Sequence, residues 1–116
     1  MDDAAGMTII VSTAGTGVDV ELIGALDVAN VANAASALLA AVEVGRHPVR
    51  VLLSHVSAID QAGVEALLDA ATAAGRIGAR VVLVEPSKRV LDLLLLHGVD
   101  HRFTIERRAS ALAGAR

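Results

Sequence analysis

The sequence predicts a single α/β domain in which a mixed β-sheet packs against α-helices. The chain has 116 residues, which is enough for one hydrophobic core and too few for two. It opens with two short apolar stretches joined by a glycine-containing turn, and short apolar stretches then alternate with longer amphipathic ones. A hairpin followed by such alternation gives the order β-β-α-β-α-β-α-β, with the later strands parallel.

The hairpin is predicted from the first two apolar stretches. Residues 7–12 are β-branched and apolar, and residues 18–23 alternate apolar side chains with Asp19 and Glu21. Between them, residues 14–17 contain two glycines, which is typical of a tight turn.

A first helix is expected after Asp27, whose carboxylate is suited to accept the free backbone N–H groups of a helix N-terminus. Gly45 is placed to end this helix. Apolar residues recur at steps of three and four and predict one buried face: Val28, Val31, Ala35, Leu38 and Val42.

The next apolar stretch, residues 49–53, predicts a strand covered on both faces. A second amphipathic helix follows, with Asp60 as its expected N-cap and with Gly75 and Gly78 marking its end and the next turn. Its expected buried stripe consists of Val64, Leu67, Leu68 and Ala71.

Residues 80–84 predict a further strand, and Ser87 is the expected cap of a third helix that Gly98 ends. The residues of this helix expected to face inward are Val90, Leu91, Leu94 and Leu95. Residues 103–105 suit a last short strand. We expect a flexible leader at residues 1–6, the domain at 7–106, and a frayed or disordered tail at 107–116.

Composition argues against several classes of partner. Phe103 is the single aromatic residue, so stacking on nucleic-acid bases is nearly excluded, and the net charge of −3 does not suit a polyanion or an anionic membrane. No apolar run approaches the roughly 20 residues of a membrane-spanning helix. The acidic start at Asp2 and Asp3 is unlike a signal peptide, so a cytoplasmic protein is expected.

Residue patterns for catalysis or metal binding are weak. The chain has no Cys and no nucleophile-elbow or phosphate-loop motif, so we expect neither an enzyme nor a cofactor. His97 and His101 have the spacing of a helical zinc pair, but Gly98 lies between them and no third ligand is near in sequence. No metal site is therefore predicted.

Four basic residues lie near the start of the third predicted helix and the strand before it: Arg76, Arg80, Lys88 and Arg89. They form either a small patch for an acidic partner or anion, or an ordinary solvated surface.

Four local strings, in this order and at these intervals, resemble the STAS domain of anti-sigma factor antagonists. They are the G-x-L-D-like residues 24–27, the L-S-G-V-x-x-I-D-like residues 53–60, the start of the second helix at residues 62–68, and residues 94–100 with Phe103 behind them. The resemblance extends over roughly residues 7–106 and implies a mixed sheet packed with helices.

The resemblance also implies a protein switch. Members of this family bind an anti-sigma factor, often a serine kinase, and phosphorylation of a hydroxyl in a D-S-S-G-type loop prevents that binding. In this chain Gln61 and Ala62 occupy the two hydroxyl positions, and Leu52 replaces the usual Asp before L-S. The implied docking is retained here, but a phosphorylatable residue at position 62 is not.

The partner-binding residues that we expect from this resemblance are Ser54, Ser57, Asp60, Gln61, Ala62, Gly63, Glu65 and Asp69. Ser54 and Ser57 could serve as substitute phosphorylation sites or act only as loop residues. Two other functions stay open: an accessory subunit of a membrane transport ATPase, and a small-ligand or nucleotide-binding module. The apolar edge of the hairpin is also compatible with a homodimer.

Overall fold

The protein is described by a computed structural model that covers residues 6–107. The expected leader and tail lie outside the described residues, apart from Gly6 and Arg107. The elements in chain order are β1 (Met7–Ala14), β2 (Gly17–Leu26), α1 (Val31–Glu43), β3 (Val49–Leu52), β4 (Val56–Ile59), α2 (Gln61–Arg76), β5 (Val81–Val84), α3 (Lys88–Leu96), the short 3-10 helix η2 (Asp100–Arg102) and β6 (Thr104–Glu106).

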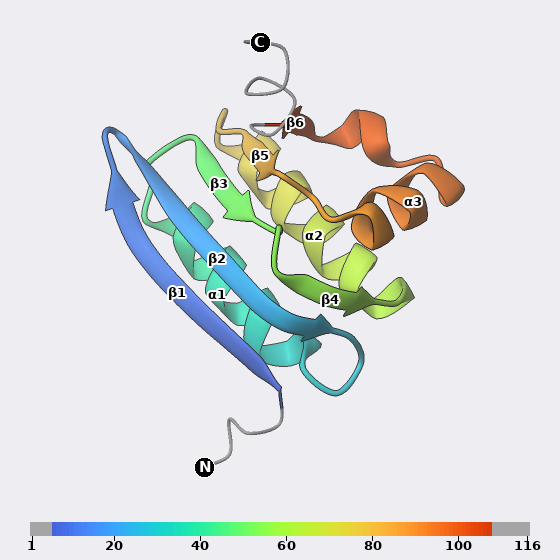
Figure 1. Cartoon of the computed structure of the whole chain (residues 1–116). Helices are drawn as coiled ribbons and strands as arrows, with labels where there is room; N and C mark the ends of the chain where they lie inside the picture. Colours follow the sequence, from blue (N-terminus) through green and yellow to red (C-terminus); the bar gives the residue numbers. More distant parts are fainter. Residues whose placement is uncertain (1–5, 108–116) are drawn as a thin grey trace, which may run out of the picture.

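The strands form one mixed sheet in the order β1-β2-β3-β5-β6, and β4 pairs with β2 (Figure 1). The β1–β2 hairpin is antiparallel and every other pairing is parallel. The α/β class, the mixed sheet and the N-terminal hairpin are therefore confirmed.

Strand β4 was not expected from the sequence, since the predicted order has one strand, at residues 49–53, between the first two helices. Its position follows from the length of β2, which has ten residues and extends beyond the four-residue strand β3. Strand β3 pairs with β2 over Val18–Glu21 of β2, and β4 pairs with the remaining half, from Gly24 opposite Val56 to Leu26 opposite Ile59. Strand β4 thus satisfies backbone groups of β2 that β3 does not reach.

The hydrophobic core lies on the face of the sheet that α1 and α2 cover (Figure 1). Leu22, Val51 and Leu83 of three neighbouring strands are fully buried there. On the opposite face, Arg50 and Leu52 of β3 are only half-buried. The prediction that this strand is covered on both faces is therefore wrong, because both long helices pack on one side of it.

Helix α1 begins later than expected. Its N-cap is Asn30, and residues 28–30 form a turn that precedes the helix. Asp27 closes this turn, since its Oδ1 accepts hydrogen bonds from the backbone N–H groups of Ala29 (3.1 Å) and Asn30 (3.3 Å). Val28 lies in the turn and is 74% exposed, so its predicted place on the buried face is wrong.

The ends of α2 agree with the sequence at one side only. Asp60 is the N-cap, as expected. Gly75 does not end the helix, which continues to Arg76. The chain turns at Gly78, as expected, and its φ of +73° is a conformation that glycine adopts readily.

Helix α3 begins after Ser87, as expected, but Ser87 makes no side-chain cap. Its hydroxyl instead donates a hydrogen bond of 3.1 Å to the carbonyl oxygen of Val56, which ties the start of α3 to β4. Val90 and Leu94 are buried as predicted, whereas Leu95 is 54% exposed and its predicted inward orientation is wrong.

Candidate functional site

The candidate site is centred on the N-terminus of α2, where Asp60 joins two segments of the chain. Its Oδ1 accepts a hydrogen bond of 3.1 Å from the backbone N–H of Gly63, which caps the helix. Its Oδ2 accepts a second bond of 3.0 Å from the backbone N–H of Val28, in the turn before α1. Asp60 is half-buried, and both carboxylate oxygens are used within the protein.

Val28 is a site residue that the sequence did not reveal. The hydrogen bond to Asp60 places the turn that carries Val28 beside the start of α2, and its side chain is exposed. An exposed aliphatic side chain next to a polar helix N-terminus is suited to contact with a partner. The available signal was Asp27, which closes a short turn as readily as it caps a helix.

Three of the predicted residues follow one exposed edge of α2. Gln61, Glu65 and Asp69 are four residues apart and exposed, and the Nε2 of Gln61 donates a hydrogen bond of 3.2 Å to Oε2 of Glu65. Ala62 is half-buried in the first turn beside them. We call Val28, Gln61, Ala62, Glu65 and Asp69 the α2 surface.

Gly63 lies near this surface but is buried. A Cβ atom at this position would collide with the carbonyl oxygen of Leu26 at the end of β2. Gly63 therefore lets the start of α2 approach β2 closely, and the structure gives this residue a packing role.

Ser54 and Ser57 are both exposed and precede the helix. The hydroxyl of Ser54 lies 3.4 Å from Nδ1 of His55, and the same nitrogen lies 3.5 Å from a carboxylate oxygen of Glu21. Ser57 lies within β4. Neither hydroxyl is in the first turn of α2, where the helix dipole would favour a phosphate.

Position 62 lies beside the Asp60 carboxylate that caps the helix. It lies in the first turn of a 16-residue helix, and that turn contains no acidic side chain. Ala62 has only a methyl group, so this chain has no acceptor for a phosphoryl group there.

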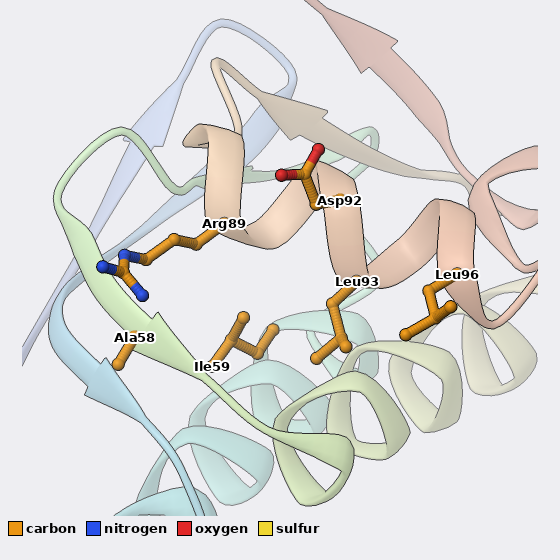
Figure 2. A pocket seen from close by; sticks show the side chains of 6 residues that line it. All are labelled: Ala58, Ile59, Arg89, Asp92, Leu93 and Leu96. Atoms are coloured by element: carbon orange, nitrogen blue, oxygen red, sulfur yellow. The ribbon is translucent and has the colours of Figure 1, made fainter.

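An open cleft of about 290 Å³ lies between β4 and α3 (Figure 2). Ile59, which lines it, directly precedes the N-cap of α2 in the sequence. The lining of the cleft consists of Ala58, Ile59, Arg89, Asp92, Leu93 and Leu96. Leu93 and Ile59 point toward one another in Figure 2, and the guanidinium of Arg89 extends toward Ala58. Asp92 forms an ion pair of 2.8 Å with Lys88, whereas Arg89 has no charged partner among residues 6–107.

The exposed leucines of α3 had a signal in the sequence. Residues 93–96 are four consecutive leucines, and four consecutive positions cover every side of a helix. Leu94 is fully buried, while Leu96 is 78% exposed. A helix with one buried face has to expose part of such a run, which therefore indicates an apolar surface.

Within the described part of the chain, no group of three or more His, Asp or Glu side chains could hold a metal ion. Both His97 and His101 are exposed. None of the helices in residues 6–107 is long and apolar enough to cross a bilayer.

Several solved structures share this fold at low sequence identity. An anti-sigma factor antagonist from Mycobacterium paratuberculosis has a TM-score of 0.78 at 19% identity, over 86% of this chain and 85% of that one. SpoIIAA in its unphosphorylated form has a TM-score of 0.73 at 18% identity, over 94% and 96%. A STAS domain protein from Planctomyces limnophilus has a TM-score of 0.73 at 19% identity, over 93% and 98%.

A search of curated protein sequences gives no match to this chain. The family model of the STAS domain, in contrast, matches residues 8–111, which include every helix and nearly all of the sheet. The matched residues make up most of the chain and contain the hairpin, the parallel strands and the helix that Asp60 caps. This chain belongs to the STAS domain family.

Proposed function

We propose that this chain is a non-enzymatic binding domain that docks an anti-sigma factor through the α2 surface and thereby regulates sigma-factor-dependent transcription. The main support is the exposed, mixed polar and apolar surface at the N-terminus of α2, in a fold shared with anti-sigma factor antagonists. Gln61, Glu65 and Asp69 supply polar contacts, and Val28 supplies an apolar one.

The proposed antagonist lacks the usual switch at position 62. A phosphate in the first turn of α2 would be stabilised by the helix dipole while placing about two negative charges in the docking surface. Ala62 removes this possibility, so binding is not turned off there. Ser54 and Ser57 are exposed but lie outside that turn, so phosphorylation of either would add charge without the dipole.

The cleft between β4 and α3 extends the proposed docking surface. Ile59 lines the cleft and directly precedes Asp60, so the two regions are continuous along the chain. Leu96 offers an apolar contact, and the free guanidinium of Arg89 is suited to a carboxylate of the anti-sigma factor. We expect Leu96→Ala to weaken partner binding about tenfold, a loss found for the minority of interface side chains that carry most of the binding energy.

The decisive experiment begins with affinity purification of the tagged chain from its source cells, with partners identified by mass spectrometry. Binding of the purified partner is then compared by calorimetry for the wild type, Ala62→Glu and Ala40→Glu. Ala40 is exposed near the C-terminal end of α1, far from the turn at residues 28–30, and makes a matched control. We expect at least a tenfold loss for Ala62→Glu and none for the control, and equal binding by all three would contradict the docking surface.

If the partner is a serine kinase, Ala62→Ser should restore the switch. The variant, incubated with the partner and ATP, should gain one phosphate at that position, whereas the wild type should gain none there. Peptide mass spectrometry locates the phosphate. Modification of Ser54 or Ser57 in the wild type would show that regulation has moved within the chain.

The cleft is also the observation that favours the second candidate function, a small-ligand or nucleotide-binding module. Its volume of about 290 Å³ is at the lower limit of the roughly 300–1,000 Å³ found for ligand pockets, and it is open. A nucleotide would be only partly enclosed, so protein docking is the better fit. Thermal unfolding with and without nucleotides separates the two functions, because a ligand of the folded state raises its stability.

A further inference from the structure

Strand β1 is a long outer edge of the sheet. It has eight residues and is the first strand in the order β1-β2-β3-β5-β6, so β2 is its one neighbour among the described strands. The N–H and C=O groups that point away from β2 are free to pair with another strand. The opposite edge, β6, has only three residues.

The features that usually protect such an edge are missing from β1. Its sequence, MTIIVSTA, has no charged residue and no proline. Its register with β2 is unbroken from Met7 opposite Gly24 to Ala14 opposite Gly17, so no bulge bends the edge away. Ile10 and Val11, on opposite faces, are 47% and 55% exposed.

We propose that β1 is a homodimer interface, in which the β1 strands of two copies pair antiparallel and join the two sheets. Directly opposite residues must lie on the same face of the continuous sheet, so the twofold axis passes midway between one residue and the same residue of the second copy. Centring it on Ile10 places Ile10 against Ile10 of the second copy. Thr8 then faces Ser12, and Ile9 faces Val11, so apolar side chains meet apolar ones and hydroxyls meet hydroxyls.

Charge is also compatible with a second copy. Among residues 6–107, the acidic residues nearest to this edge are Asp19 and Glu21, which lie on β2 opposite Ser12 and Ile10. In the dimer three strand spacings separate these acids from their counterparts, about 14 Å, which exceeds the Debye length of about 8 Å at physiological ionic strength. Strand β4 and the start of α2 lie on the other side of β2, so the α2 surface stays free in both copies.

One strand per subunit is a smaller interface than the roughly 800 Å² per partner of typical stable complexes. The dimer is therefore in equilibrium with the monomer, and its fraction rises with protein concentration. This property determines which experiments can detect it.

Single cysteine variants test both the interface and its register, because the chain has no Cys of its own. Directly opposite Cα atoms lie about 4.5–5.5 Å apart, within disulfide reach. The Cα atoms of residue 11 in the two copies would lie roughly 8 Å apart, which is too far for a disulfide. Under mild oxidation we expect Ile10→Cys to form linked dimers at least tenfold faster than Val11→Cys or the exposed control Val44→Cys.

Equal rates for the three variants would indicate random collisions and overturn the proposal, and faster linking of Val11→Cys would overturn the register. Sedimentation velocity of the unmodified chain provides a second measurement. The average mass should rise with concentration, and Ile10→Lys should remain monomeric while the exposed control Ile77→Lys behaves like the wild type. A wild-type chain that is monomeric at every concentration would overturn the second-copy proposal and leave the edge open to a strand from another protein.

Discussion

Asp60 connects local helix formation to the shape of the candidate site. One oxygen of its carboxylate caps α2 through the N–H of Gly63, and the other holds the turn at Val28. The side chain therefore positions two parts of the α2 surface, while both of its carboxylate oxygens are already hydrogen-bonded within the protein. In the proposed docking, the contribution that we expect from Asp60 is therefore indirect, through the placement of Val28 and Ala62.

Replacing Asp60 with Ala should lower the free energy of unfolding by about 1–3 kcal/mol, because a helix cap and a second backbone hydrogen bond are lost together. Asp69→Ala is the matched control, since Asp69 is exposed on the same helix and the charge change is equal. We expect the control to change stability by less than about 0.5 kcal/mol. Urea denaturation measures both, and equal losses would mean that net charge accounts for the effect.

The capping role of Asp60 could be predicted from local sequence, since an Asp before an amphipathic stretch is a typical N-cap. Its bond to Val28 could not, because the two residues are 32 positions apart and only the folded sheet brings them together. For the same reason Val28 could be placed correctly only after the turn at residues 28–30 was seen.

At the scale of one element, α3 divides its leucines between two environments. Leu94 is fully buried in the core, while Leu96 borders the cleft and is largely exposed. Helical geometry alone requires this division, because neighbouring residues point about 100° apart. Only the buried face is needed for folding, so the exposed leucines are available for binding.

Alanine substitution should separate these roles. We expect Leu94→Ala to lower the free energy of unfolding by about 2–5 kcal/mol, the usual cost of a cavity in a packed core. Leu96→Ala should cost less than about 0.5 kcal/mol because little of its side chain is buried. Thermal and urea unfolding provide the comparison, and a large loss from Leu96→Ala would mean that this leucine supports the fold.

At the scale of the whole molecule, Arg50 links strands across the face of the sheet opposite α1 and α2. Its Nε lies 3.2 Å from a carboxylate oxygen of Asp19 on β2, and its Nη1 lies 3.0 Å from one of Glu106 on β6. Since β5 separates β3 from β6, this side chain reaches over a strand. The two ion pairs thus connect the centre of the sheet to its edge strand β6.

Arg50→Met, which keeps an unbranched apolar stem but removes the guanidinium, should destabilise the protein by about 0.5–2 kcal/mol, since partly exposed ion pairs contribute about 0.2–1 kcal/mol each. The difference from wild type should shrink in 1 M salt, which screens the charges. Lys88→Met removes the exposed helical pair with Asp92 and should cost less. A loss that does not depend on salt would assign the effect to packing.

The sequence was sufficient to predict the overall architecture. Hydrophobic periodicity marked all three helices, and the alternation of strands with helices predicted a mixed sheet. Periodicity could not predict β4, because a four-residue strand has too few positions to show a pattern and exists here only through its pairing with the end of β2. The cleft formed by β4 and α3 was hidden for the same reason.

The division of β2 between two partners has a consequence for motion. Strand β3 is held on both sides, by β2 and β5, whereas β4 is paired only with β2 among the described strands. Residues 53–55 interrupt the two strands, so we expect β4 to open more readily than the centre of the sheet. We expect the backbone amide of Ala58 to exchange with deuterium faster than that of Val51. Equal exchange rates would mean that β3 and β4 open together as one cooperative unit. Faster exchange at Ala58 would mean that β4, which borders the α2 surface, can adjust to a partner without disturbing the core.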